Sequence, residues 1–225
     1  MVLLDRQSSR IRLAIGLLTA LVLGLGLFAE IVTHLPPPPL IRRDFLTVLS
    51  PSFENNLPSW WLSTLLALSG GVLALCASAA DKHSWRWWLT SAGLLLLSLD
   101  ESAGLHGAVA SMYESTIGIF GLGFVLPAIV VAAGAALLYL PWIRRLPARS
   151  RLLFGAAAWL YLTGALFLQF LQSLWIHGPG EQSPLSTVID LLQKPLEILG
   201  ASLLLVALLD QLGGERDDRR RSSQP

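Results

Sequence analysis

The sequence has few charged residues, one cysteine and no strong excess of either charge. Only 14% of its 225 residues are charged, whereas a soluble domain of this length carries roughly a quarter, and this deficit excludes a water-facing globule. A net charge of +1 excludes the basic surface that nucleic acids need, so we expect no nucleic-acid partner. The lone Cys76 excludes an internal disulfide and a cage of thiolate ligands. Nucleotide-loop, serine-nucleophile and CxxC motifs are also absent.

Long apolar segments fill most of the chain. A helix that crosses a bilayer needs about 20 mainly apolar residues, and six segments qualify: 12–34, 60–80, 87–108, 118–140, 152–175 and 186–212. The arginines before the first segment are also typical of a secretory signal, but Leu27 stands where a cleavage site needs a small residue. We therefore predict an all-α bundle of six transmembrane helices over residues 1–212, followed by a flexible cytoplasmic tail over residues 213–225.

The basic residues predict an orientation, because Lys and Arg accumulate in cytoplasmic loops. In the six-span arrangement, 13 of the 16 basic residues fall on one side of the membrane, in the amino terminus, the second and fourth connections and the tail. Only Arg42, Arg43 and Lys194 fall on the other side. We expect both termini in the cytoplasm and the lipid bilayer as the principal partner.

The carboxylates are distributed in the opposite way. In this topology nine acidic residues lie in the outer half of the membrane or outside it, which gives the outer side a net charge of −6. Asp100 and Glu101 follow the apolar run LLLLSL, and Asp100 lies about 20 Å along the helix from Trp87. A charge at the centre of a span costs roughly 2.5–3.5 kcal/mol. We therefore expect these two residues to face the bundle interior, to form a pair or to hold a proton.

Other predicted spans bring polar side chains to a similar depth. In the sixth span Asp190, Lys194 and Glu197 share one face, and Pro195 must start or kink the helix. The residues predicted to line one ligand- or ion-binding site are Asp100, Glu101, His106, Gln169, Gln172, Lys194 and Glu197. Two simpler interpretations stay open: a carboxylate at Glu197 favoured by a helix start, and Lys194 as its ion-pair partner only.

The histidines raise the hypothesis of a divalent metal ion as cofactor. His106, Asp100 and Glu197 offer the nitrogen and oxygen ligands that such ions take. One helix cannot supply the whole site, because Glu101 and His106 point about 140° apart on an ideal helix. His34 and His177 lie at the ends of the first and fifth spans and are further candidates, although histidine at a span end is often only interfacial. No catalytic residue emerges from these patterns.

Two strings carry a family resemblance. ENNLPSWW (residues 54–61) leads into the second span, and LSLDESAGLH (residues 97–106) lies in the third. Together they resemble an uncharacterised family of bacterial polytopic membrane proteins, with Asn-x-Pro-Ser/Thr-Trp before the second span and Asp-Glu…His-Glu in the third. The glutamate of that family's final span is matched by Glu197, whereas Gly107 replaces the acid after the histidine. The resemblance implies a multi-pass protein of the bacterial cytoplasmic (inner) membrane and supplies no reaction.

Three functions fit these patterns. We favour a non-enzymatic membrane protein whose acid-lined outer site binds or conducts a cation, a proton or a small polar ligand. The first alternative is a structural or assembly subunit that packs against other membrane subunits through the Gly- and Ala-rich span 118–140. The second is a metal-dependent membrane hydrolase for lipid-like substrates, with a metal-activated water and Glu101 or Glu197 as general base.

Overall fold

The computed structural model describes residues 2–34, 43–53, 55–79, 84–105, 107, 125–144, 146–176 and 184–222, and within these ranges the chain is all-helical with no β-strand. The helices of the amino-terminal part are α1 (Val2–His34), α2 (Arg43–Leu49), α3 (Leu57–Ala79), α4 (Ser84–Ala103) and α6 (Val125–Ile143). The carboxyl-terminal part consists of α7 (Ala148–Leu162), a π-helical segment (Thr163–Leu168), α8 (Gln169–Ile176) and the long α9 (Pro184–Ser222).

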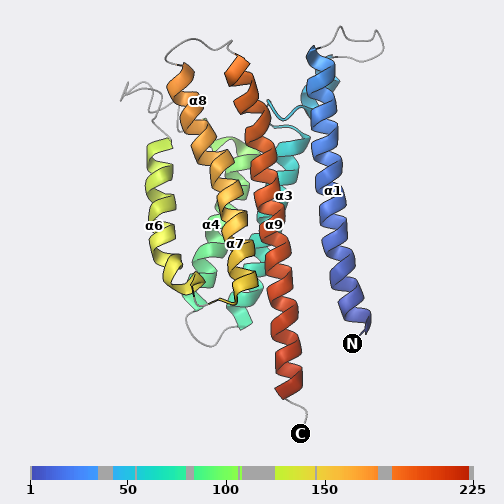
Figure 1. The fold of residues 1–225 in the computed structure, drawn as a ribbon, viewed down its shortest axis with the longest axis vertical. Coiled ribbons are helices and arrows are strands. Elements are labelled where there is room, and N and C mark those ends of the chain that lie inside the picture. Colours follow the sequence, from blue (N-terminus) through green and yellow to red (C-terminus); the bar gives the residue numbers. More distant parts are fainter. Residues whose placement is uncertain are drawn as a thin grey trace.

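The long helices run side by side, and the start of α1 and the end of α9 lie at the same end of the bundle (Figure 1). We call this the terminal end and the opposite one the distal end. Four segments are long and apolar enough to cross a membrane: Ser9–Thr33, Leu57–Ser78, Ala148–Gln172 and Val188–Leu212. The apolar part of α6, Pro127–Pro141, is shorter. Four of the predicted spans are therefore helices that are long and apolar enough to cross a membrane.

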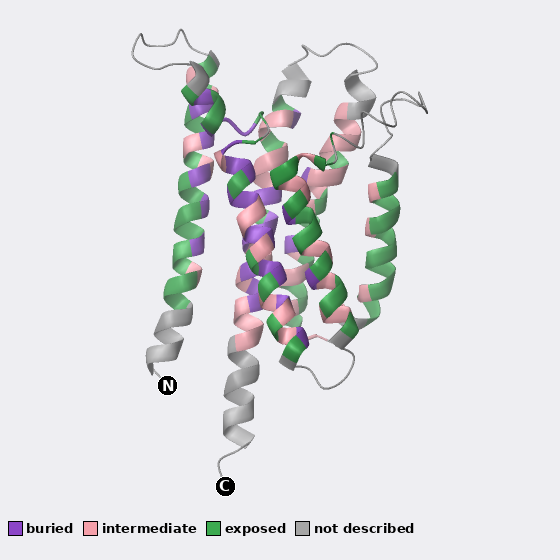
Figure 2. Ribbon diagram, turned by 180° about the vertical axis from the view of Figure 1, so that it is seen from behind, coloured by how far each residue is buried: buried purple, intermediate pink, exposed green. Residues whose placement is uncertain are grey.

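The apolar core lies between α1, α3 and α9. Leu62, Leu65 and Leu66 of α3 and Ile198 of α9 are at most 1% exposed. Buried residues gather on these helices, whereas most of α6 is exposed (Figure 2). Large apolar side chains such as Leu137 are exposed on the outer faces. Apolar surface of this extent is rare on soluble monomers and marks contact with a membrane or a protein.

Small residues bring α3 and α4 together in an antiparallel register. The hydroxyl oxygens of Ser63 and Ser98 lie 2.9 Å apart, and each hydroxyl also donates to the other residue's carbonyl oxygen. Two turns away, Ser91 Oγ donates to the Gly70 carbonyl oxygen at 2.8 Å. Small residues of this kind let helices approach closely in membranes. The contact fixes the position of the last turn of α4, which carries Glu101.

One predicted span ends earlier than expected. Residues 87–108 were predicted as a span, but α4 ends at Ala103. Gly104 follows with a φ of +64°, and its N–H donates to the Asp100 carbonyl oxygen at 2.8 Å. This left-handed helix end suits glycine, and hydropathy does not reveal it. Asp100 and Glu101 consequently lie in the last turn of α4.

The last helix extends further than expected. A tail was predicted from residue 213, whereas α9 continues to Ser222. The sequence places Glu215 four residues before Arg219, and Asp217 four residues before Arg221. In the sequence, this spacing of acids before bases favours a helix beyond the glycine pair.

Gly200 sets the distance between α7 and α9. A Cβ atom at this position would lie 2.6 Å from the backbone nitrogen of Tyr161 and 2.9 Å from the carbonyl oxygen of Ala157. Backbone atoms cannot move aside as a flexible side chain can. The two helices therefore pack at this distance only because residue 200 has no side chain.

We predict that Gly200→Ala lowers the melting temperature of the detergent-solubilised protein by about 2–10 °C, because overpacking costs roughly 1–3 kcal/mol. Tryptophan fluorescence during heating measures the transition. The control is Gly24→Ala, since no atom lies within 4 Å of a Cβ there; it should leave the melting temperature unchanged or slightly raised. Equal melting of the two variants would contradict the close contact.

Candidate functional site

Three charged side chains from two helices meet in the distal half of the bundle. Lys194 Nζ of α9 lies 2.8 Å from Glu101 Oε1 of α4 and 3.2 Å from Glu197 Oε2, one turn further along α9. The side chains of Lys194, Glu101 and Glu197 are only 15%, 13% and 5% exposed. We call them the charged triad. It contains two carboxylates for one ammonium group.

Amide side chains extend the charged triad toward the distal end. Gln193 Nε2 donates to Gln169 Oε1 at 2.9 Å, and Gln193 lies one turn before Glu197 on α9. About one turn closer to the distal end, Gln172 Nε2 donates to Asp190 Oδ1 at 2.5 Å. Two hydrogen-bonded layers between α8 and α9 thus continue from the charged triad.

Tyr161 of α7 and Asp100 of α4 complete the surroundings of the charged triad. Tyr161 lies within range of the charges of Glu197, Glu101 and Asp100. Asp100 is half-buried. The site therefore draws polar groups from α4, α7, α8 and α9.

The two helices that supply the amide layers are both irregular at this level. Pro195 lies inside α9 and cannot donate a hydrogen bond to the carbonyl four residues earlier. The helix over 148–176 contains the π-helical segment, a feature frequent at functional sites. Its Gly164 packs on α9: a Cβ there would lie 2.7 Å from the Gln193 carbonyl oxygen and 2.9 Å from Glu197 Cγ. The π-helical segment fits against Glu197 because residue 164 has no side chain.

A further acidic group lies at the distal end. Ser50 Oγ and Ser52 Oγ both donate to Glu30 Oε1, the latter at 2.7 Å. The next loop is fixed by Asn56, whose Oδ1 accepts the Ser59 N–H at 2.9 Å at the start of α3. Glu30 lies close enough to Asp190 for its charge to act there. Acidic groups therefore continue from the charged triad to the distal end.

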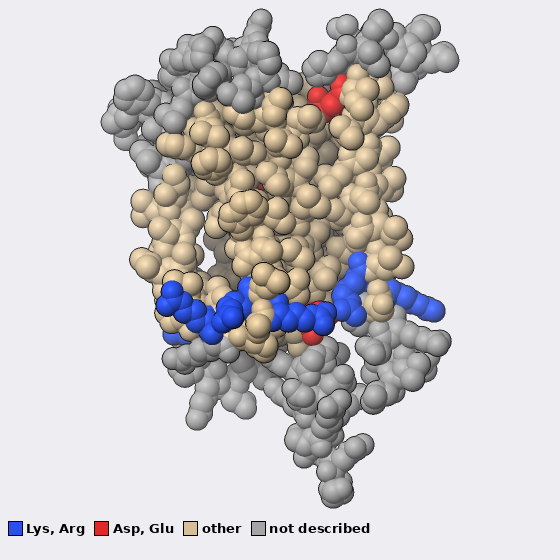
Figure 3. All heavy atoms as spheres, in the orientation of Figure 1, with Lys and Arg blue, Asp and Glu red and all other residues tan. Residues whose placement is uncertain are grey.

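The charges at the terminal end have the opposite balance. Asp210 of α9 contacts Arg12 of α1, and its Oδ2 lies 2.9 Å from Arg149 Nη2 of α7. On the face drawn in Figure 3, a band of Lys and Arg crosses this end, with an acidic side chain beside it, and an acidic patch lies at the distal end. This cluster contains two basic groups for one carboxylate.

The structure brings most of the described site residues predicted from the sequence together around α9. The structure joins Glu101, Lys194 and Glu197 directly and brings Gln169 and Gln172 to α9 beside them. Asp190, which the sequence placed on the face of Lys194, accepts a hydrogen bond from Gln172 of α8. Two contributors were not predicted, namely Gln193 and Tyr161. An amide directly before Lys194 marks Gln193 as a polar position in an apolar span, but its contact with Gln169 on another helix is visible only in the structure.

The metal hypothesis depends on three histidines. His106 and His177 lie outside the described residues, and α1 ends at His34, whose side chain is not described. Within the part of the chain that the structure describes, no group of three or more His, Cys, Asp or Glu side chains is arranged to hold a metal ion. Metal ligation by these histidines with Asp100 and Glu197 stays a prediction.

We predict that Lys194→Met lowers the melting temperature by about 10 °C, because removing one partner of a buried ion pair costs roughly 3–5 kcal/mol. Adding Glu101→Gln and Glu197→Gln to it should restore most of the loss, since no unpaired charge then remains. Arg149→Met is the control: this side chain is 79% exposed, and exposed pairs contribute little. A loss no larger than that of the control would contradict a buried triad.

Comparisons with known proteins identify one family. No curated protein and no solved structure is significantly similar to the chain. The model of a family described as a domain of unknown function (DUF8692) matches residues 11–212. The matched residues include the charged triad, both amide layers and, except for residues 9 and 10, the four helical segments of membrane-spanning length. The chain therefore belongs to the family of the domain of unknown function DUF8692.

Proposed function

We propose that the chain is a multi-pass protein of the bacterial inner membrane with six spans and both termini in the cytoplasm. Helix α4 has 20 residues and α6 has 19, so each is about 30 Å long, the thickness of the hydrocarbon core. Both lie alongside the four longer apolar helices (Figure 1). The basic band at the terminal end supports a cytoplasmic location for that end. The distal end is then extracytoplasmic.

Labelling of single cysteines tests this orientation in a Cys76→Ser background. Ser52 at the distal end and Ala148 at the terminal end are both exposed. We expect a membrane-impermeant maleimide to label the Ser52→Cys protein in intact spheroplasts, and the Ala148→Cys protein only after permeabilisation. The reverse pattern would contradict the orientation, and labelling of both proteins in intact spheroplasts would contradict the span count.

The function that the geometry supports best is binding of a small monovalent cation from the extracytoplasmic side. The observation that carries it is the composition of the charged triad: two carboxylates and one ammonium group, each at most 15% exposed. With both carboxyl groups ionised, one negative charge remains in excess. An uncompensated charge in a span is costly, and one bound cation would neutralise it. The amide oxygens beside Glu197 are further ligands of the type that hard cations take.

The position of the apolar core favours binding over conduction. Polar groups continue from the charged triad to the distal end, but in the other direction Leu62, Leu65 and Ile198 are fully buried and close the bundle. Within this core Thr19 Oγ1 and Ser202 Oγ lie 2.8 Å apart and satisfy each other. A cation that enters from the distal end therefore reaches a binding site that apolar side chains close on the opposite side.

We predict that one of LiCl, NaCl and KCl raises the melting temperature by several degrees when it replaces choline chloride at fixed pH and ionic strength. A ligand at one hundred times its Kd stabilises a protein by about 2.7 kcal/mol. Glu197→Gln should abolish the effect, because the charged triad is then neutral. Asp210→Asn, on the same helix at the terminal end, is the control and should keep it. Equal melting in all four salts would contradict cation binding.

A further inference from the structure

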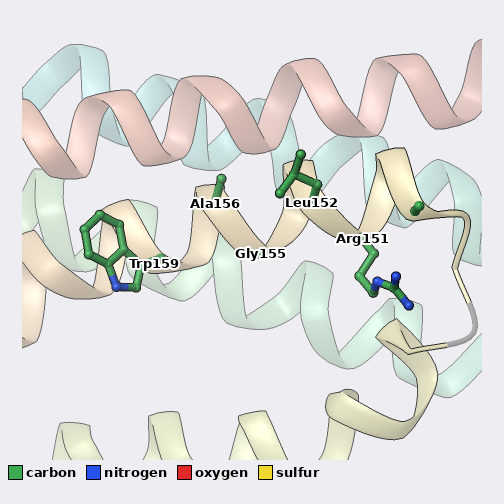
Figure 4. A pocket seen from close by; sticks show the side chains of 6 residues that line it. Arg151, Leu152, Gly155, Ala156 and Trp159 are labelled. Carbon is green, nitrogen blue, oxygen red and sulfur yellow. The ribbon is translucent and has the colours of Figure 1, made fainter.

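One face of α7 carries a groove far from the charged triad. An open surface hollow of about 540 Å³ is lined by Ala148, Arg151, Leu152, Gly155, Ala156 and Trp159, all of α7. Figure 4 shows Arg151 near one end of this row, Trp159 at the other and Gly155 between them. The groove faces away from α9, because the buried Ala157 lies on the opposite side of α7.

The groove combines an apolar floor with a single charged end. Leu152 and Trp159 are 73% and 67% exposed. At Gly155 no atom lies within 4 Å of an added Cβ, so the hollow in the middle is open. Arg151 is exposed and has no ion pair with any described residue, in contrast to Arg149, which pairs with Asp210.

The depth of the groove matches one leaflet of a bilayer. Arg151 lies in the first turn of the apolar segment Ala148–Gln172, at the terminal end of the bundle. Trp159 lies about 12 Å further along the helix at 1.5 Å per residue. One leaflet contributes about 15 Å of hydrocarbon. The guanidinium group therefore lies at headgroup level, and the apolar floor extends to near the midplane.

We propose that this groove binds one anionic phospholipid of the cytoplasmic leaflet. Its phosphate pairs with Arg151, because guanidinium groups recognise phosphate through charge-assisted hydrogen bonds. An acyl chain lies over Gly155 between Leu152 and Trp159. The assignment to the cytoplasmic leaflet rests on the proposed topology, whereas the groove itself is independent of the cation site.

Native mass spectrometry of the protein in mild detergent tests the proposal, with phosphatidylglycerol and phosphatidylcholine as probes. We expect one phosphatidylglycerol to be retained in preference to phosphatidylcholine. Arg151→Gln removes the charge and Gly155→Leu fills the hollow, and each should weaken retention about tenfold. The matched controls are Arg144→Gln, another exposed arginine, and Gly134→Leu, where an added Cβ also meets no atom within 4 Å. Both controls should retain the lipid as the wild type does.

Three results would overturn the proposal. Equal retention of the two lipids would exclude recognition of the headgroup charge. If Arg144→Gln and Arg151→Gln reduce phosphatidylglycerol retention equally, the lipid is attracted to the basic band as a whole and not to a defined site. If the wild-type protein forms a dimer and Gly155→Leu dissociates it, the groove is an interface between copies of the chain. Glu197→Gln should keep lipid retention and Arg151→Gln should keep the cation response, so failure of either proposal is distinguishable from failure of the other.

Discussion

The ion pair between Lys194 and Glu101 is the constraint on which the distal half of the bundle depends. It joins α9 to α4 where neither side chain is more than 15% exposed. In such surroundings opposite charges attract more strongly than in water, and an unpaired charge is more costly. Sliding either helix by one turn, about 5.4 Å, would leave a buried charge without its partner. The register of the two helices is therefore set by this requirement as well as by packing, and the serine contacts between α3 and α4 conform to it.

The π-helical segment explains how Gln169 and Gln172 come to face α9. The face of α7 that packs on α9 contains Ala157 and Tyr161, and Gly164 continues it. In a regular α-helix this face would recur near residues 168 and 171, at 3.6 residues per turn. One extra residue shifts the recurrence by one position, to Gln169 and Gln172, which contact α9 in the structure. The irregular backbone is thus what directs both amides toward the site, and Gly164 makes room for it.

The sequence predicts part of this arrangement because hydropathy and helical spacing are local properties. They locate the long apolar helices and place Lys194 and Glu197 on one face. They do not reveal the φ at Gly104 that ends α4 early, nor the π-helical segment, because each is a backbone state that an apolar pattern permits without requiring. Gln193 was missed for a related reason: its position adjacent to Lys194 gives no indication that it reaches Gln169 on another helix. The span count and orientation depend on a bilayer, so they stay predictions.

Helix α9 carries two ionic clusters with opposite compositions. The depth of each cluster in the bundle determines whether solvent can neutralise its surplus charge. At the terminal end two arginines share Asp210, and Arg149 is 79% exposed. Water and lipid headgroups can neutralise that surplus positive charge, so no specific ligand is needed. The charged triad has the reverse ratio, but Glu197 is only 5% exposed and lies about 20 Å further along the same helix. Solvent cannot screen its surplus negative charge effectively there. The same charge imbalance is therefore an ordinary surface property at one depth, and at the other it is the basis of the proposed cation binding.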